Sequence, residues 1–429
     1  MKPAGPLAPL VALAAALAYL PSFAGAFQFD DYNVIVGYPT VHSWQALFER
    51  ASGGVRAVLK ASYVLNWTSG LGLFGFHLVN LGLHALNASL LFVLGTRLFP
   101  EQRGAALAAA LLFALHPAQT EAVTYVSGRS VSLMAAFYLL AFLFYTADRR
   151  AVSVLLFLLA LATRETAVTL PVALLLYEIL KGESWRTIAR RQAPYWAIVA
   201  AGALVLLFSA RYHELITYGF GRRSLVDNLV TQIGGVSYLV LQLVFPFRQN
   251  IDPALPTLTH LDPVLACQAA LLALLLALGI SQTGRRPWLA FGVLWFFLQL
   301  APTNSLVPRL DVANDRQLYL AGWGLFLALS VQVARLELPA MVPRGVTAVI
   351  LAGLVFLNIG RQLDYRDEVT LWEETVRGAP WNPRAHNNLG YAYYLAGRQA
   401  EAQREMRIAL ALDPAYLKAR ANLRLLDWK

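Results

Sequence analysis

Charge and cysteine are both scarce in this sequence, and each shortage excludes a class of protein. Charged residues make up 14% of the 429 residues and hydrophobic residues 58%. Soluble domains are about 25% charged, so this composition excludes an ordinary soluble domain and indicates a multispan membrane protein. The single cysteine, Cys267, excludes an intramolecular disulfide and argues against thiol chemistry.

Several catalytic motifs are also missing. The sequence has no HExxH pattern and no cysteine pair that would predict a zinc site. It has no glycine-rich phosphate loop and no G-x-S-x-G elbow, so ATP, nicotinamide and serine-hydrolase chemistry have no support. We therefore expect neither a metal nor a cofactor.

Acidic residues are outnumbered by basic ones, 25 against 35, which gives a net charge of +10. In a membrane protein, basic residues at span ends and an anionic lipid-phosphate ligand account for such an excess. We expect contact with membrane lipid and no nucleic-acid partner.

Twelve apolar segments predict a polytopic helical membrane protein with roughly 11–12 hydrophobic segments. The first resembles a signal peptide, but we favour an uncleaved span. Several are shorter than the ~20 residues that cross a bilayer, and we expect Leu229–Phe245 to be re-entrant or interfacial. The segments are Leu7–Ala26, Phe74–Leu94, Gly104–Leu115, Ser130–Tyr145, Val152–Ala162, Val168–Leu180, Tyr195–Ala210, Leu229–Phe245, Pro263–Ile280, Pro287–Ala301, Leu318–Val333 and Gly345–Ile359.

Basic residues on alternate loops set the expected orientation. Loops rich in Lys and Arg stay in the cytoplasm, which predicts an inner-membrane protein with Asp30 on the exported, periplasmic side. Ionisable residues collect on that side, and at membrane depth such residues are usually functional. A shared cavity is the hypothesis; ordinary loop charges flanking the spans are the alternative. The set is Asp30, Asp31, Arg56, His77, His116, Glu121, Arg129, Arg164, Glu165, Asp227, Asp315 and Arg316.

Three polar residues follow one another at helical spacing within an otherwise apolar span. Asn80, His84 and Asn87 share a helix face. We expect them to form interhelical hydrogen bonds. His77 lies nearer the exported end, where it has a chance of reaching the cavity.

The composition changes abruptly after Ile359, where the chain becomes charged and repetitive. Ala385, Asn388 and Leu389 recur 34 residues later as Ala419, Asn422 and Leu423. This period predicts a short tetratricopeptide-repeat domain at 361–429, after a membrane domain at 1–360. Fewer than three repeats stack poorly alone, so we expect docking on the membrane domain or on a partner. The alternative is an amphipathic helical tail.

An ordered set of short motifs resembles a known family. The sequence is similar to the transmembrane and tetratricopeptide-repeat-containing O-mannosyltransferases and their bacterial relatives, which are glycosyltransferases of the GT-C class. The resemblance covers nearly the whole chain. The motifs are Asp30-Asp31, Gly75 to Asn80, His116-Pro117 to Val123, Ser127 to Ser130, Arg164-Glu165-Thr166, Asp227-Asn228-Leu229, Pro302 to Ser305, Asp315 to Leu320 and the repeat tail.

The resemblance implies a polyprenyl-phosphate-linked sugar as donor, a hydroxyl acceptor on an exported protein, and inversion at the anomeric carbon. Asp30 is then the expected general base, with Asp31 as its structural or electrostatic neighbour. The expected phosphate ligands are Arg129, Arg164 and Arg316, because guanidinium groups bind phosphate bidentately. The remaining ionisable residues of the set are expected to line the cavity.

Two other classes of function remain open on sequence alone. A transporter or lipid flippase with a repeat-built docking tail also carries buried charges, although we find no symmetric halves in the spans. A non-catalytic scaffold would use the repeats but leaves the exported-side charges unexplained.

Overall fold

The computed structural model describes residues 7–49, 56–336, 339 and 341–427, and within these ranges the chain forms helices and no β-strand. The predicted apolar segments lie on helices apart from a few terminal residues, which confirms the helical polytopic class. In this described part, six helices are long and apolar enough to cross a membrane, or up to eight if each of two bent helix pairs is one span.

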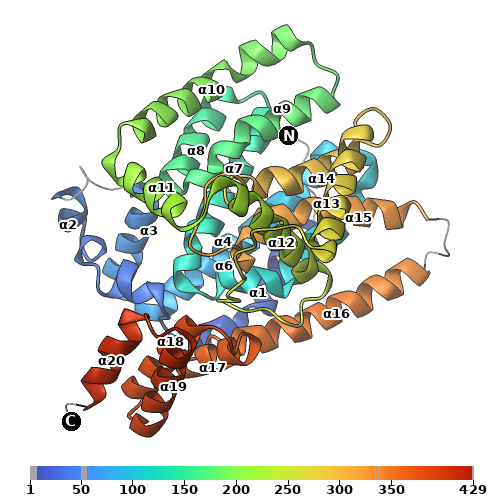
Figure 1. Ribbon diagram of the computed structural model, residues 1–429. Coiled ribbons are helices and arrows are strands. Elements are labelled where there is room, and N and C mark those ends of the chain that lie inside the picture. The colour runs from blue at the N-terminus through green and yellow to red at the C-terminus, as the bar shows by residue number, and fades with distance from the viewer. Residues whose placement is uncertain (1–6, 50–55, 337–338, 340, 428–429) are drawn as a thin grey trace.

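The first part of the chain packs around α4, the long helix Gly72–Leu98 (Figure 1). Helices α1 (Leu7–Ala18), α5 (Arg103–Leu115) and α7 (Arg129–Thr146) lie against it. The shorter elements of this part are η1 (Leu20–Ala24), η2 (Tyr32–Val36), η3 (Pro39–Val41), α2 (Trp44–Glu49), α3 (Ala57–Thr68), η5 (Pro100–Gln102), η6 (Pro117–Gln119), α6 (Thr120–Val123) and η7 (Val126–Gly128).

The second part of the membrane region is centred on α15 (Leu318–Ala334), which packs against α5 and α14 (Pro287–Leu300). Its core is aromatic: the rings of Trp295 and Trp323 lie 5.4 Å apart in an edge-to-face contact. The other elements are α8 (Arg150–Thr163), η8 (Glu165–Thr169), α9 (Leu170–Leu180), α10 (Trp185–Leu207), α11 (Ala210–Arg222), α12 (Leu225–Val244), α13 (Pro263–Ser281), η9 (Asp315–Gln317) and α16 (Met341–Leu363).

The segment expected to be re-entrant forms α12, a helix of 20 residues. The end of α11 meets it at an angle of 83°, which fits either a broken span or a re-entrant loop.

The polar stripe on α4 forms the interhelical hydrogen bonds that its spacing predicts. Asn80 Nδ2 donates to the carbonyl oxygens of Val123 and Val126, at 3.1 and 3.2 Å. His84 bonds the Tyr319 hydroxyl at 3.1 Å, and Asn87 Nδ2 donates to the same hydroxyl at 3.0 Å. These bonds join α4 to α15 and to the polar segment before α7, so they fix the end of the bundle where that segment lies.

The repetitive segment folds into paired helices, as the 34-residue period predicts. Helix α18 packs along α19, and a Cβ added to Gly390 would lie 2.8 Å from Met406 Cγ, so this close approach requires the glycine. The proposed boundary at residue 360 falls within the last turn of α16, which runs to Leu363. The helices are α17 (Glu368–Gly378), α18 (Pro383–Leu395), α19 (Gln399–Leu412) and α20 (Leu417–Asp427).

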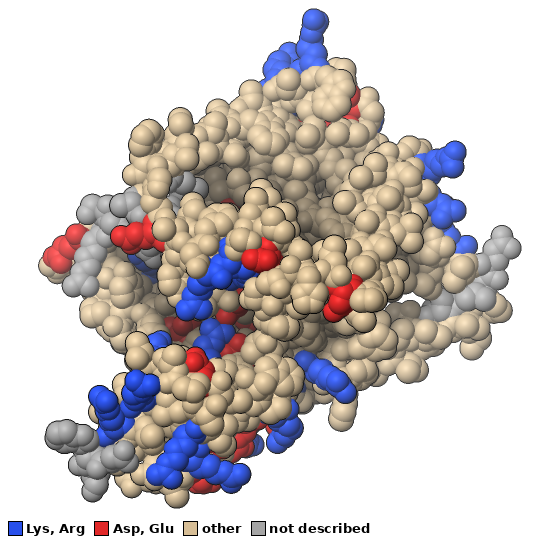
Figure 2. Space-filling model, in the orientation of Figure 1, with Lys and Arg blue, Asp and Glu red and all other residues tan. Residues whose placement is uncertain are grey.

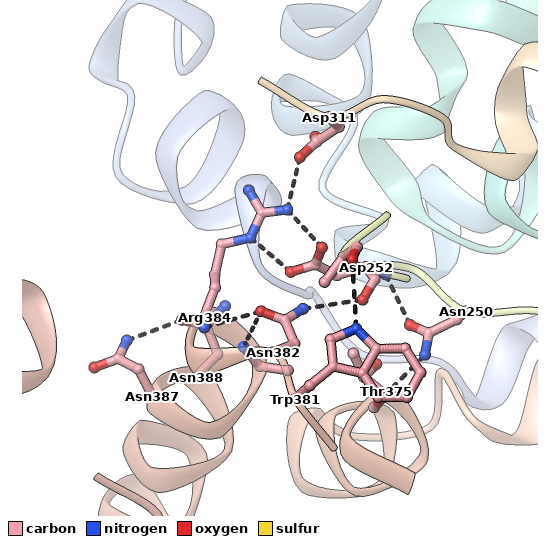
Figure 3. A network of polar contacts seen from close by, with 11 residues as sticks. Asn250, Asp252, Asp311, Thr375, Trp381, Asn382, Arg384, Asn387 and Asn388 are labelled. Carbon is pink, nitrogen blue, oxygen red and sulfur yellow. Dashed lines mark hydrogen bonds and ion pairs between the residues drawn. The ribbon is translucent and has the colours of Figure 1, made fainter. Parts of the chain in front are cut away.

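The repeat helices dock on the membrane region through a polar network at the start of α18 (Figure 3). Arg384 donates to both carboxylate oxygens of Asp252 and to Asp311 Oδ1, each at 2.6 Å. Asn382 Nδ2 donates to the Asp252 carbonyl, and Asn250 Nδ2 donates to the Thr375 carbonyl, each at 3.0 Å. One guanidinium group therefore ties α18 to two separate loops.

Candidate functional site

The first polar loop turns its two adjacent carboxylates in different directions. Asp31 is fully buried and accepts backbone N–H groups from Gln28 at 3.0 Å and Ser127 at 2.8 Å. Asp30 is half-buried, and its backbone N–H donates to the Tyr125 hydroxyl at 2.9 Å. Phe29 precedes them with a positive φ of 43°, an unusual conformation that sets the direction of the turn.

The two carboxylates also differ electrostatically. Burial raises the pKa of Asp31 to about 7, although its two backbone N–H bonds oppose the shift. Burial also raises the pKa of Asp30, and the nearby guanidinium of Arg316 opposes that rise. Among the described residues, no donor forms a hydrogen bond to the Asp30 carboxylate. Asp30 is therefore the member of the pair that is open to a ligand.

The polar segment between α5 and α7 places a buried carboxylate against Arg316. Glu121 Oε2 accepts the backbone N–H of Arg316 at 2.9 Å, and its Oε1 lies 3.4 Å from Arg316 Nε. A Cβ on Gly128 would lie 2.3 Å from the Glu121 carbonyl oxygen, so only glycine permits this fold of the segment. Asp315 is buried beside the pair with Oδ1 unpartnered. Glu121 thus orients and neutralises Arg316.

A pocket opens between Arg164 and Arg316. Arg164 Nη1 donates to Ser130 Oγ at 2.8 Å, which points its guanidinium across the N-terminal end of α7. Beside it, Glu165 accepts three charged hydrogen bonds from Arg56, the shortest 2.9 Å. Figure 2 shows acidic and basic side chains gathered in a recess between the repeat helices and the membrane region. The pocket is lined by Val131, Met134, Arg164, Thr166, Gln299, Thr303, Arg316, Gln317 and Leu320.

The placement of Arg129 argues against its predicted phosphate-binding role. It is fully buried, and its Nε donates to Asn80 Oδ1 at 2.7 Å. Its two terminal nitrogens donate to the carbonyl oxygens of Ser62 and Phe76 at 3.1 and 2.9 Å. Each of its three nitrogens bonds the protein, so Arg129 ties α3 and α4 to α7, and it does not line the pocket described above.

Three other predicted residues also bond the protein itself. His77 Nε2 lies 3.1 Å from the Gly25 carbonyl oxygen, and His116 Nε2 lies 3.1 Å from that of Leu243. Asp227 accepts the Ser224 hydroxyl at 2.6 Å in the first turn of α12. None of the three lines the pocket described above. Their cavity-lining role was expected from position along the chain, which does not fix the direction of a side chain.

Several residues of the site had no assigned role in the sequence analysis. Gln299 and Thr303 line the pocket, and Tyr125 orients Asp30. Thr303 belongs to one of the motifs that carry the family resemblance, so the sequence could have pointed to it. Arg309, which the electrostatics place beside Arg164 and Arg316, had none, because a lone arginine in a loop is not a pattern.

These features define a class: a helical multispan membrane protein in which an open aspartate lies within electrostatic range of an arginine-lined pocket, beside docked repeat helices. Comparison with known proteins then points to a family. The chain is 24% identical to a protein O-mannosyl-transferase of Caenorhabditis elegans over 93% of its length. It is 25% identical to protein O-mannosyl-transferase TMTC4 of Homo sapiens over 92%, and 31% identical to TMTC3 of Mus musculus over 41%. The chain is a relative of the TMTC O-mannosyl-transferases, as its motifs predict.

The chain is shorter than these relatives. It spans 61% of the worm protein, 65% of human TMTC4 and 22% of mouse TMTC3. No protein-family profile and no solved structure matches it.

Proposed function

We propose that this chain is a membrane glycosyltransferase that moves a sugar from a polyprenyl-phosphate-linked donor to a hydroxyl group of a protein acceptor. The names of its relatives support a protein O-mannosyl transfer. One observation carries the mechanism: the open carboxylate of Asp30 is within electrostatic range of Arg316, which lines the pocket. A base and an anion site in one recess are what transfer from a phosphate requires.

In the proposed reaction, the Asp30 carboxylate takes the proton of the acceptor hydroxyl as its oxygen attacks the anomeric carbon. The bond between that carbon and the phosphate oxygen breaks, and its electron pair passes to the phosphate. Attack from the face opposite the leaving group inverts the anomeric carbon. Guanidinium groups stabilise the departing phosphate, so no metal is needed for charge stabilisation. That no metal takes part remains a prediction.

The membrane and the side are also part of the proposal. We infer that the chain lies in the inner membrane with Asp30 and the repeat helices on the exported side. The repeat helices would recruit the acceptor, because α17 contacts the Asp30 loop directly: the Phe29 N–H donates to Glu368 at 3.0 Å. An acceptor bound there would lie beside the proposed base.

The test of the mechanism is Asp30→Asn, which keeps the shape of the side chain but removes its basicity. We expect turnover to fall roughly 10²–10⁴-fold, since that is the usual contribution of a general base. The measurement is intact-mass profiling of exported proteins from deletion cells complemented with each variant, with protein level and melting temperature as controls. Asp148→Asn, at an exposed ion pair with Arg150, is the matched control.

A sugar-mass increment that persists at the wild-type rate with Asp30→Asn would remove Asp30 from the mechanism. If no sugar-mass increment depends on the presence of the chain, the proposed glycosyltransferase activity is wrong, and the flippase alternative is favoured. A flippase would still move labelled polyprenyl-phosphate sugar across a proteoliposome membrane, so that assay separates the two functions.

A further inference from the structure

Two arginines, Arg164 in the pocket lining and Arg309 in a neighbouring loop, form no ion pair with a carboxylate among the described residues. Three guanidinium groups nearby form ion pairs: Arg56 with Glu165, Arg316 with Glu121, and Arg384 with Asp252 and Asp311. Within the described part of the chain, no carboxylate lies within ion-pair distance of Arg164 or Arg309. Positive charge that the protein leaves uncompensated here is available to an anion.

Arg309 does not line the pocket itself, but it lies within electrostatic range of Arg164 and Arg316, which do. Its Nη1 is buried without a hydrogen-bond partner. Its charge is repelled by those of Arg316 and Arg56 and attracted by those of Asp311 and Glu165, although neither carboxylate is within ion-pair distance. Burial lowers the pKa of Arg309, and Arg316 lowers it further. Because a buried guanidinium without a counter-ion is costly, this arrangement indicates a binding site and not a structural pair.

The backbone that carries Arg309 is firmly held. Residues 303–312, here called the 303–312 loop, are closed at the neck by Asn304, whose Nδ2 donates to the Val312 carbonyl at 3.1 Å. Asn228 Nδ2 donates to the Ser305 carbonyl and Arg223 Nη2 to the Arg309 carbonyl, each at 2.6 Å. Arg309 is therefore positioned before any ligand arrives.

Helix α11 also packs closely on this loop. A Cβ on Gly219 would lie 2.5 Å from the Pro308 carbonyl oxygen, so this contact requires glycine. The loop thus has a fixed inner side, against α11 and α12, from which only the Arg309 side chain extends without a partner.

The outer side of the 303–312 loop is apolar. Leu306 is 60% exposed, Val307 45% and Leu310 59%. Next to membrane-spanning helices, such exposed apolar side chains are suited to contact with hydrocarbon. The loop therefore presents an apolar tip and, on its other side, a guanidinium group. A ligand that contacts both has a phosphate at the end of a hydrocarbon chain.

We propose that Arg164 and Arg309 together hold the phosphate of the lipid-linked donor while Leu306, Val307 and Leu310 contact its first hydrocarbon units. This inference rests on the proposed function and adds Arg309 to it. It also moves the main phosphate contact away from Arg316, whose charge Glu121 already neutralises. When the sugar leaves, the phosphate oxygen gains the bonding electron pair and the phosphate charge rises from one towards two. Two unpaired guanidinium groups match that product.

The phosphate contact is tested by measuring binding of undecaprenyl phosphate, undecaprenol and inorganic phosphate to the full chain in nanodiscs. For Arg309→Gln we expect undecaprenyl phosphate to bind about 10- to 100-fold more weakly, because a charged hydrogen bond contributes about 1.5–3 kcal/mol. Binding of inorganic phosphate should weaken as well, whereas undecaprenol binding should not change. Arg286→Gln, on the exposed loop before α14, is the matched control.

The apolar tip is tested with the double variant Leu306→Asn and Leu310→Asn. It should weaken binding of undecaprenyl phosphate and of undecaprenol but leave inorganic phosphate unchanged. Leu395→Asn is the control, because Leu395 is as exposed as Leu310, 59%, but lies on the repeat helices.

Wild-type affinity of Arg309→Gln for undecaprenyl phosphate, in protein with an unchanged melting temperature, would overturn this inference. A different result would separate it from the proposed function. If the wild-type chain binds phosphatidic acid but not undecaprenyl phosphate, and Arg309→Gln abolishes that binding, the phosphate site stands and the proposed donor is wrong.

Discussion

Asp30 and Asp31 are neighbours in the chain, but their chemistry is set by different surroundings. Both carboxylate oxygens of Asp31 accept backbone N–H groups, one from Gln28 and one from Ser127. Asp31 therefore joins the first loop to the turn before α7. The Asp30 carboxylate accepts no hydrogen bond from the described residues and remains available to a ligand. The same division explains why one carboxylate suits a base and the other does not.

Asp31→Asn should destabilise the protein. Asparagine has one acceptor oxygen, so one of the two N–H groups would face another donor, at a cost of about 1–3 kcal/mol. The pKa of Asp31 is raised to about 7, so the native state binds this proton more tightly than the unfolded state. The contribution of Asp31 to stability should then be largest at acid pH and fall as pH rises through 7. The difference in stability between the wild type and Asp31→Asn should therefore be smaller at alkaline pH.

Melting temperatures of the two proteins at pH 5 and pH 8 check this. If Asp31→Asn has the same melting temperature as the wild type at pH 5, the hydrogen bonds of Asp31 do not stabilise the loop.

The proton affinity of Asp30 should appear in the pH dependence of turnover. A base must be ionised, and burial raises its pKa, so kcat/KM should rise with pH through a value above that of an ordinary aspartate. Lys418 lowers this pKa through its charge. Lys418→Gln should therefore shift the acid limb of the pH profile, the part where kcat/KM rises with pH, to higher pH. The shift should be small, since Lys418 is exposed.

Lys181→Gln is the matched control, because that lysine follows α9 at the other end of the molecule from the repeat helices (Figure 1). A shift of the limb to lower pH with Lys418→Gln, or an equal shift in the control, would contradict the assignment of the limb to Asp30.

Among the elements, α18 has a special position because it touches the loops that complete the site. Arg384 joins it to Asp252, in the loop after α12, and to Asp311, in the 303–312 loop that also carries Arg309. Burial opposes ionisation of Asp311, but Arg384 outweighs it and lowers the pKa of that carboxyl. A repeat helix therefore contributes directly to the order of the pocket.

Arg384→Gln should loosen both loops, because the change leaves two partly buried carboxylates without their counter-ion. We expect faster backbone hydrogen exchange in residues 250–262 and 303–312, and weaker donor binding, with the membrane helices unchanged. Arg398→Gln, which removes an exposed pair with Glu401 on the same repeat helices, should change neither. Unchanged exchange in both loops would mean that the docking network is only a local contact.

Across the whole molecule, the repeat helices lie at the end of the membrane region that carries Asp30. Gln28 Nε2 donates to the Tyr365 carbonyl at 2.9 Å, just before α17. The core of the repeats also includes Tyr125 and Ile251, which come from the membrane region. The repeat helices therefore dock on the membrane region, one of the two arrangements expected for so short a repeat array, and they contact the first loop.

This arrangement predicts the labelling of single cysteines in intact cells. In a Cys267→Ser background, Asn33→Cys and Gln399→Cys should both react with a membrane-impermeant reagent, while Arg285→Cys should react only after lysis. Gln399 is a better probe site than the nearby Gly397, because the positive φ of Gly397, 77°, disfavours a side chain. Labelling of residue 399 only after lysis would reverse the orientation and remove the recruiting role of the repeats.

The sequence by itself determined the class of this protein. Its lack of charge required a membrane, its apolar runs placed the helices, and its 34-residue period predicted the repeat pairs. Even the bonds of Asn80, His84 and Asn87 followed from their spacing, because residues three and four apart share a helix face. These properties depend on local sequence patterns, so they can be predicted without knowing the tertiary structure.

Only the tertiary structure decided which charged groups remain available. Arg129, Arg164, Arg309 and Arg316 are the same side chain in the sequence. In the fold, the donors of Arg129 bond Asn80 and two carbonyl oxygens, Glu121 neutralises Arg316, and Arg164 and Arg309 have no carboxylate partner among the described residues. Whether a charge is paired depends on partners far away in the chain, and their distances are set by packing. No local pattern contains that information.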